Sequence, residues 1–227
     1  MPTSVARKIG PAVLALGFGF ALAAAPVAQA KDSGFLKDYS QLKPERDAAG
    51  VERRVWTSPK FTRSAYEKLL VEPVVFYPEP QPSKQVSARD LKEMREYLDA
   101  TIRHLLTGVI QIADAPGPGV ARVRVAVTAT ETEGAALKPY QLVPIALVVT
   151  AAKKAASGPQ HDVKLAVELD VTDSVSGEAL ARAVRPAKGV EVEGGQRLTL
   201  ALAKPRIDQW AETVRASIAA RMKQAGR

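Results

Sequence analysis

The amino-acid sequence predicts an α+β fold: a mainly antiparallel sheet with two main helices packed on one face, a two-layer sandwich, preceded by an irregular N-terminal arm. Two segments, 120–130 and 161–172, alternate apolar and polar residues. This period is typical of strands with one buried face and one wet face. Two other segments, 87–107 and the stretch that follows Pro205, repeat apolar residues at helical spacing.

The first thirty residues have the three parts of a secretory signal peptide: a basic start, an uncharged apolar middle and a small-x-small end. The apolar part is shorter than the roughly 20 residues that a membrane-spanning helix needs. We therefore expect export to the periplasm, with removal of residues 1–30. The three parts lie at Arg7 and Lys8, at residues 11–25, and at Ala28 and Ala30, with cleavage before Lys31.

The composition limits the chemistry that holds the fold together. The chain has 227 residues and no cysteine, so an exported form has no disulfide and no lipid-modified cysteine. We therefore expect a periplasmic protein that is not lipidated. The net charge of +8 is spread along the chain, which favours solubility over nucleic-acid binding because no aromatic residues interleave with the basic ones.

Residues 31–64 are predicted to form the irregular arm, because their aromatic anchors follow neither a strand nor a helix period. A single α+β domain is predicted over 65–227, with an apolar insert at about 134–158. The domain opens with a strand over Glu67–Tyr77. Pro73 lies within this strand and predicts an edge position or a bulge, since proline cannot donate to a ladder.

The strongest helix prediction is Ser87–Thr107. Ser87 and Asp90 resemble a capping box at its start, and Gly108 suits its C-terminal cap. One face of the helix carries an apolar stripe made by Leu91, Met94, Leu98, Ile102 and Leu105.

The second half of the chain is predicted to contain most of the sheet and the last helix. The segments are a short strand at Val109–Ala113, a turn at 114–119, strands at Val120–Thr130 and His161–Thr172, a hairpin turn at Asp173–Gly177 and a returning strand at Glu178–Val184. Pro205 suits the first turn of the last helix. Four residues of that helix recur at helical spacing and should dock it on the sheet: Ile207, Trp210, Val214 and Ile218.

The insert contains eleven uncharged residues, Leu142–Ala152, followed by two lysines. One interpretation is a buried helix or a hydrophobic loop that closes the core. The other is a contact patch for a protein partner or for a membrane surface, with the lysines near anionic headgroups. The candidate contact residues are Leu142, Ile145, Leu147, Val148, Lys153 and Lys154.

The sequence shows no recognisable catalytic, metal-binding or cofactor-binding motif. Its two histidines, His104 and His161, lie far apart and have no cysteine to join them, which disfavours a zinc site. No G-x-S-x-G elbow, dinucleotide-binding motif or P-loop occurs. Two pairs of acids at strand ends leave open a carboxylate-pair hydrolase: Glu131 with Glu133, and Glu191 with Glu193.

Several short motifs, in order and spacing, resemble the family of bacterial envelope proteins known as domain of unknown function 3313. They are Ser33–Leu42, Leu70–Tyr77, Asp114–Val120 leading into Arg122–Thr128, Asp173–Glu178, and a helix with Trp210-Ala211. The resemblance implies an envelope location, and its members are typically predicted lipoproteins, whereas this chain has no lipobox cysteine. It implies no activity, because none is agreed for the family.

These observations lead to one preferred hypothesis and two alternatives. We expect an exported, non-catalytic cell-envelope protein that interacts with a protein partner or takes part in envelope assembly. The alternatives are a periplasmic hydrolase that acts on envelope polysaccharide or peptide through a carboxylate pair, and a weak binder of anionic lipid. No cofactor is expected.

The signal peptide gives the first prediction. When the chain is expressed in a Gram-negative host, the periplasmic form should begin at Lys31, because the peptidase cleaves after the small residue Ala30. N-terminal sequencing of the periplasmic fraction checks this. A cytosolic form that retains Met1, without any processed species, would contradict it.

Overall fold

The computed structural model describes residues 32–47, 50–130, 146–148, 164–192 and 196–225. Its main sheet has eight strands in the order β1-β2-β9-β8-β6-β3-β5, with β4 also pairing with β6. A separate parallel pair joins β7 to β10. The strands are β1 Lys43–Arg46, β2 Glu52–Thr57, β3 Lys68–Val71, β4 Val75–Tyr77, β5 Gln111–Ile112, β6 Val120–Thr130, β7 Ala146–Val148, β8 Lys164–Asp173, β9 Ala179–Ala187 and β10 Val190–Val192.

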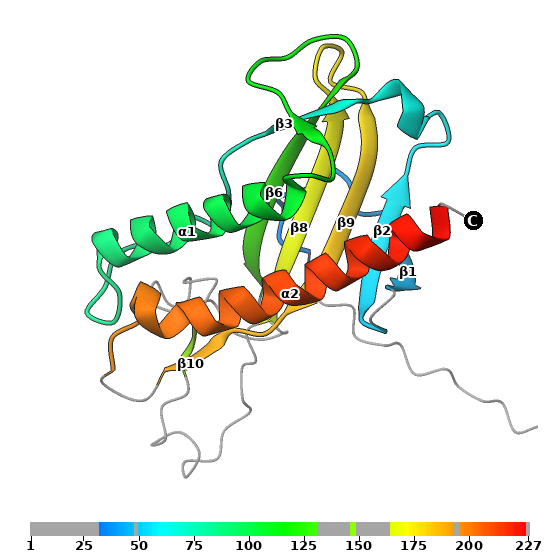
Figure 1. The fold of residues 1–227 in the computed structure, drawn as a ribbon. Helices are drawn as coiled ribbons and strands as arrows, with labels where there is room; N and C mark the ends of the chain where they lie inside the picture. Colours follow the sequence, from blue (N-terminus) through cyan, green and yellow to red (C-terminus); the bar gives the residue numbers. More distant parts are fainter. Residues whose placement is uncertain (1–31, 48–49, 131–145, 149–163, 193–195, 226–227) are drawn as a thin grey trace, which may run out of the picture.

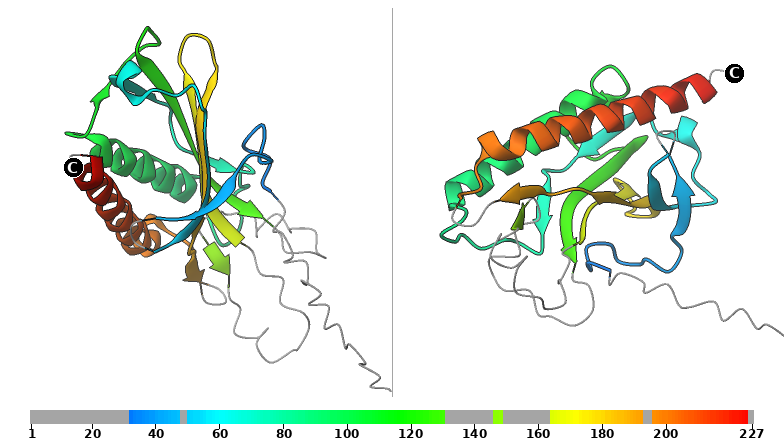
Figure 2. Two further views of the ribbon diagram at one scale, coloured as in Figure 1. Left: turned by 90° about the vertical axis from the view of Figure 1, so that its right-hand side faces the viewer. Right: turned by 90° about the horizontal axis from the view of Figure 1, so that it is seen from below.

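Two helices, α1 (Ala88–Leu106) and α2 (Leu200–Ala225), cover one face of the main sheet (Figure 1). Viewed along the sheet, both helices lie on one side and the N-terminal arm lies on the other (Figure 2). Along the path β1-β2-β9-β8-β6, each pair of neighbouring strands is antiparallel, whereas β3 and β4 run parallel to β6. The predicted α+β class, with a mainly antiparallel sheet and helices on one face, is therefore confirmed.

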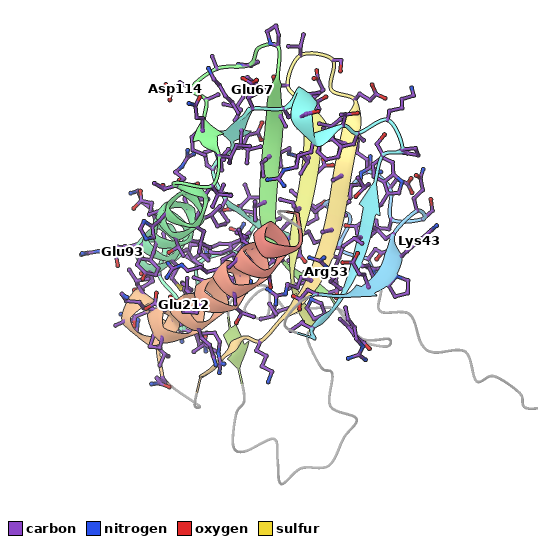
Figure 3. The ribbon with its side chains drawn as sticks, turned by 45° about the vertical axis from the view of Figure 1, so that its right-hand side comes forward. Lys43, Arg53, Glu67, Glu93, Asp114 and Glu212 are labelled. Carbon is purple, nitrogen blue, oxygen red and sulfur yellow. The ribbon has the colours of Figure 1, made fainter. Side chains whose placement is uncertain are left out.

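The hydrophobic core fills the space between the helices and the sheet. The apolar stripe predicted on α1 is buried along its whole length. It meets the helix-facing residues of β6, among them Val123, Val125 and Val127. Charged side chains such as Lys43, Glu93 and Glu212 lie around the outside of the domain (Figure 3).

The ends of α1 follow the sequence prediction. The Ser87 hydroxyl accepts a hydrogen bond from the Asp90 backbone N–H at 3.1 Å, and the Asp90 carboxylate accepts one from the Ser87 backbone N–H at 3.3 Å. Gly108 follows the C-cap with a φ of 79°. A side chain is strained in this left-handed conformation, so glycine ends the helix cleanly.

The strand predicted over Glu67–Tyr77 is two strands in the structure. Pro73 lies between β3 and β4, and both of these strands pair with β6. Proline offers no N–H for the ladder, so the pairing stops at Pro73 and resumes at Val75. The Glu72 backbone N–H still bonds to the Val123 carbonyl at 3.0 Å, which keeps the two strands on the same neighbour.

The arm is less irregular than predicted. Residues 43–57 form an antiparallel hairpin of β1 and β2, and β2 pairs with β9 at the edge of the sheet. The addition satisfies the backbone groups that β9 would otherwise expose along that edge. The predicted irregular course holds for residues 32–42, which have no regular strand or helix.

Helix α2 begins before the position that Pro205 predicts. It starts at Leu200, and Pro205 lies inside it. The Thr199 hydroxyl, which accepts from the Leu202 backbone N–H at 3.4 Å, acts at the N-terminus. Pro205 has no N–H to donate to the Ala201 carbonyl, so this carbonyl lacks its intrahelical hydrogen bond. Both residues are exposed. The helix backbone continues to Ala225.

The arm is fastened to the second face of the sheet by one buried carboxylate. Glu168 of β8 is 2% exposed and accepts hydrogen bonds from the Tyr39 hydroxyl at 2.7 Å and the Thr128 hydroxyl at 2.9 Å. Burial, reinforced by Glu168, raises the pKa of Tyr39 to about 12. The Tyr39 oxygen also accepts from the Leu36 backbone N–H at 3.0 Å, so a single side chain organises the arm.

No helix in the described ranges has the length and apolar character required to cross a bilayer.

Replacing Tyr39 with Phe tests this attachment. The change leaves the buried Glu168 carboxylate without one donor, so the Tyr39→Phe variant should lose about 1–3 kcal/mol in the free energy of unfolding. Urea denaturation measures the loss. Trypsin should also cleave faster after Lys37, an exposed arm residue, because the arm detaches more often.

Tyr66→Phe is the matched control, since the Tyr66 hydroxyl bonds at 3.1 Å to Asp173, a less buried carboxylate. Equal losses for the two variants would contradict a special role for Tyr39.

The pKa of Tyr39 lies above its ordinary value of 10.0, so the unfolded state loses the proton first. This contribution to stability is complete below pH 10, declines as the pH rises toward 12, and is absent from Tyr39→Phe.

Candidate functional site

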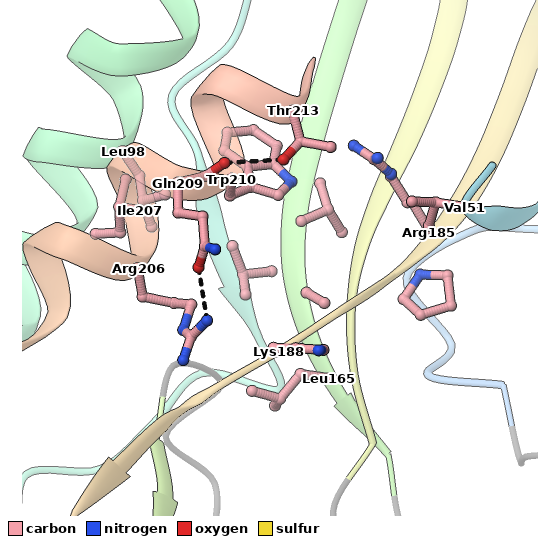
Figure 4. A pocket seen from close by; sticks show the side chains of 14 residues that line it. Val51, Leu98, Leu165, Arg185, Lys188, Arg206, Ile207, Gln209, Trp210 and Thr213 are labelled. Atoms are coloured by element: carbon pink, nitrogen blue, oxygen red, sulfur yellow. Dashed lines mark hydrogen bonds between the residues drawn. The ribbon is translucent and has the colours of Figure 1, made fainter. Parts of the chain in front are cut away.

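A cavity of about 300 Å³ lies between helix α2 and the helix-facing side of the sheet (Figure 4). Most of its lining is apolar and comes from α1, α2, β6 and β8, which are far apart in the sequence. The main apolar contributors are Leu98, Val127, Leu165, Val167, Ile207 and Trp210.

The cavity follows from the residues that β9 places under α2. Arg185 is opposite Val167 and Ala187 is opposite Leu165 in the β8–β9 ladder, so these β9 residues share the helix-facing side. Arg185 is held by a carboxylate at one end of the cavity, and Ala187 is small. Strand β9 therefore has no large apolar side chain here to fill the space beneath α2.

A buried ion pair closes one end of the cavity. Arg185 Nη2 lies 2.8 Å from Asp47 Oδ2, and the exposed fractions of the two side chains are 14% and 1%. Asp47 also accepts a hydrogen bond from the Val51 backbone N–H at 3.0 Å, and Ser217 of α2 lies 3.4 Å from it. The pair thus links the β1–β2 hairpin, β9 and α2.

The lining has two further cations, Arg206 of α2 and Lys188 after β9. They lie on the edge of the cavity opposite Arg185 (Figure 4). Arg206 donates a hydrogen bond to the neutral side chain of Gln209 at 2.7 Å, and Lys188 is exposed. In the described part of the chain, no carboxylate is paired with either of them. Among the described residues, this edge of the cavity therefore carries two cations that no acid neutralises.

Trp210 contributes an unused donor. Its indole Nε1 is buried and has no hydrogen-bond partner among the described residues. Buried polar atoms are rarely left without a partner, and an exception points to a water or a ligand. The indole ring itself lines the cavity, so a polar group within the cavity is a natural partner for this N–H.

The lining has no acid, histidine, serine or cysteine. Its polar side chains are those of Arg185, Lys188, Arg206, Gln209 and Thr213, and the Trp210 indole adds one N–H donor. Mostly apolar walls with a few polar groups are typical of small-molecule binding sites.

The other face of the sheet has a balanced network of charges. Arg122 is paired with Glu72 at 2.8 Å, and Asp170, which is 4% exposed, lies between Arg124 at 3.4 Å and Arg182 at 3.5 Å. Arg182 also stacks over Trp56, with 5.3 Å to the ring centroid. Acids and arginines alternate across the strands, so these described side chains pair with one another on this face.

The structure describes little of the predicted contact patch. Leu147 and Val148 belong to β7, where Leu147 pairs with Glu191 and Val148 with Val192 of β10. These residues form a strand, whereas a helix or loop was predicted. The other candidate contacts, Leu142, Ile145, Lys153 and Lys154, lie outside the described residues, so the contact patch stays a prediction.

The remaining sequence candidates are also mostly outside the described part of the chain. Ala28, Ala30 and Lys31 of the cleavage site, the acids Glu131, Glu133 and Glu193, and His161 all lie there, and for Glu191 only the backbone is described. His104 is exposed on α1, as predicted. The described residues contain no cluster of three or more His, Cys, Asp or Glu suited to a metal.

Sequence reasoning did not find the cavity. It identified Ile207 and Trp210 as docking residues of the last helix, which they are, but gave no role to Arg185, Lys188 or Arg206. No local signal distinguishes these three from the other basic residues of the chain, because only the fold brings them to one cavity.

The family described as Protein of unknown function (DUF3313) matches residues 31–214. Two similar relatives are the uncharacterized lipoprotein YdcL of Escherichia coli K12 and that of Escherichia coli O157:H7. Each is 30% identical over 162 residues, which cover 71% of this chain and 73% of the relative.

A similar solved structure is a PelC dodecamer from Paraburkholderia phytofirmans. It is 14% identical, with a TM-score of 0.29, and the match covers 69% of this chain and 93% of that one. This score is too low to support any inference about assembly.

The buried ion pair gives a prediction for the site. Asp47→Ala leaves the mostly buried Arg185 guanidinium uncompensated, so the variant should lose about 3–5 kcal/mol in the free energy of unfolding, measured by urea denaturation. Glu52→Ala is the control on the same hairpin. It breaks the Arg46–Glu52 pair, whose side chains are 68% and 71% exposed, and should cost less than about 1 kcal/mol. A cost for Asp47→Ala as small as the control's would contradict the linking role.

Proposed function

The chain belongs to the DUF3313 family, and we propose that it is an exported, non-catalytic protein of the cell envelope that binds a small apolar guest in the cavity beneath α2. The cavity, with its mostly apolar walls and no acid, histidine, serine or cysteine in its lining, is the observation that carries this proposal. Its volume of about 300 Å³ lies at the lower end of the range for small-molecule sites, about 300–1,000 Å³.

Two observations support the envelope location. The first residues of the chain have the order of a signal peptide, a basic start followed by an apolar middle and a small-residue end. The relative YdcL is named a lipoprotein. Because the present sequence has no cysteine, we propose a periplasmic form without a thioether-linked lipid.

The sequence favours a protein that binds a partner without catalysis. We infer that the bound partner is a small guest instead of an unspecified protein. The cavity supports the change because both helices and strands β6, β8 and β9 line it and present apolar side chains to its interior. A concave apolar surface is better filled by a small apolar guest than by a flat protein surface.

Filling the cavity should abolish binding. Ala187→Leu adds a branched side chain at a lining position, so the dissociation constant for N-phenyl-1-naphthylamine, a neutral apolar dye, should rise at least tenfold. The measurement is a fluorescence titration, since the dye brightens in an apolar environment.

Ala181→Leu is the matched control. Ala181 shares the strand and the face of Ala187 through its pairing with Val171 but does not line the cavity. Both variants should show a single cooperative unfolding transition. If wild type does not bind the dye, or if Ala187→Leu binds it as tightly as wild type, the proposed site is wrong.

A further inference from the structure

We propose that the guest is a single-chain anionic amphiphile: one acyl chain in the apolar part of the cavity and one negatively charged end at Arg206 and Lys188. This inference rests on the proposed function, because it uses the same cavity. It adds the chemical class of the guest, which neither the family nor its named relatives assign.

The volume of the cavity limits the guest to one acyl chain. A cavity of about 300 Å³ is at the lower limit for ligand sites, so it holds one short acyl chain and not the two chains of a membrane phospholipid. Its length agrees, since Arg206 and Thr213 of the lining are seven residues apart on α2, a separation of roughly 10 Å along a helix axis. The lining therefore extends along about two turns of α2, which is long enough for a short acyl chain.

The cations at the edge of the cavity indicate that the polar end of the guest is anionic. Two other cations of α2 are paired with acids of the same helix: Lys204 with Asp208 at 2.7 Å, and Arg215 with Glu212 at 3.0 Å. Arg206 instead contacts the neutral Gln209. Arg185 is neutralised by Asp47, so the charge that a guest meets comes from Arg206 and Lys188.

The positions of Arg206 and Lys188 favour the binding of one anion by both cations. Arg206 reaches the cavity from the helix and Lys188 from the end of β9, so they approach it from two layers (Figure 4). A carboxylate or phosphate between them would accept from both, and hydrogen bonds to charged groups are the stronger ones. Trp210 is one turn beyond Arg206, on the same side of α2, and its indole ring lines the apolar part of the cavity beside Thr213 (Figure 4).

Trp210 also provides the readout. The chain has two tryptophans, and Trp56 lies on the opposite side of the sheet against Arg182. In a Trp56→Phe background, the remaining fluorescence therefore reports on the cavity. Titration with decanoate and with decan-1-ol, two probes with the same chain and different charge, separates the charge from the apolar contribution.

We expect decanoate to bind at least tenfold more tightly than decan-1-ol at pH 8 and low salt. In the double variant Arg206→Gln, Lys188→Gln, decanoate affinity should fall to that of decan-1-ol, whose own affinity should not change. The control Lys204→Gln, Arg215→Gln removes the same charge from α2 cations that are already paired, and it should retain the preference for decanoate.

The outcomes distinguish the two proposals. If both probes bind wild type equally, or if both double variants reduce decanoate binding equally, the anionic end is wrong while the apolar site stands. If neither probe binds and N-phenyl-1-naphthylamine does not bind either, the proposed function itself fails. If anionic phospholipid vesicles change Trp210 fluorescence and decanoate does not, the site faces a membrane surface, and the single-chain guest is rejected.

Discussion

The antiparallel register between β6 and β8 is the constraint on which the rest of the molecule depends. It runs from Ala121 opposite Asp173 to Thr130 opposite Lys164, and it fixes which side chains meet the helices. Val125 and Leu169 face the core, whereas Thr128 and Glu168 face the arm. A slip of one residue would exchange the two faces of a strand, placing the buried carboxylate in the apolar core.

This register gives the domain two interfaces of different chemistry. On one face the helices bury an apolar core in which size and shape decide the packing. On the other face the arm is held by the Glu168 carboxylate and by aromatic contacts, including Arg124 over Phe35 at 4.8 Å. The second interface is more polar, and it is directional because hydrogen bonds to one buried carboxylate specify the path of the arm.

The cavity arises where these two kinds of packing meet at the end of β9. The strand places Arg185 and Ala187 under α2, and Asp47 from the edge hairpin holds the arginine to one side. The apolar layer is left incomplete at this point, with cations on the opposite edge. An incomplete core is costly unless something fills it, and a guest with an apolar chain and an anionic end matches the surface that remains.

The sequence by itself determined the elements whose cause is local. The period of the α1 stripe, the capping residues Ser87 and Asp90, and the alternation along β6 and β8 all act within one segment, and the structure has each of them. The family resemblance rested on short motifs of the same kind, and the family match over residues 31–214 confirms it.

Only the tertiary structure decided the features that need partners from distant segments. The arm's residues 43–57 became strands because the edge of β9 offered hydrogen bonds. The cavity collects residues from Val51 to Thr213. Its existence depends on how two layers fit, and no period, cap or motif within one segment carries that information.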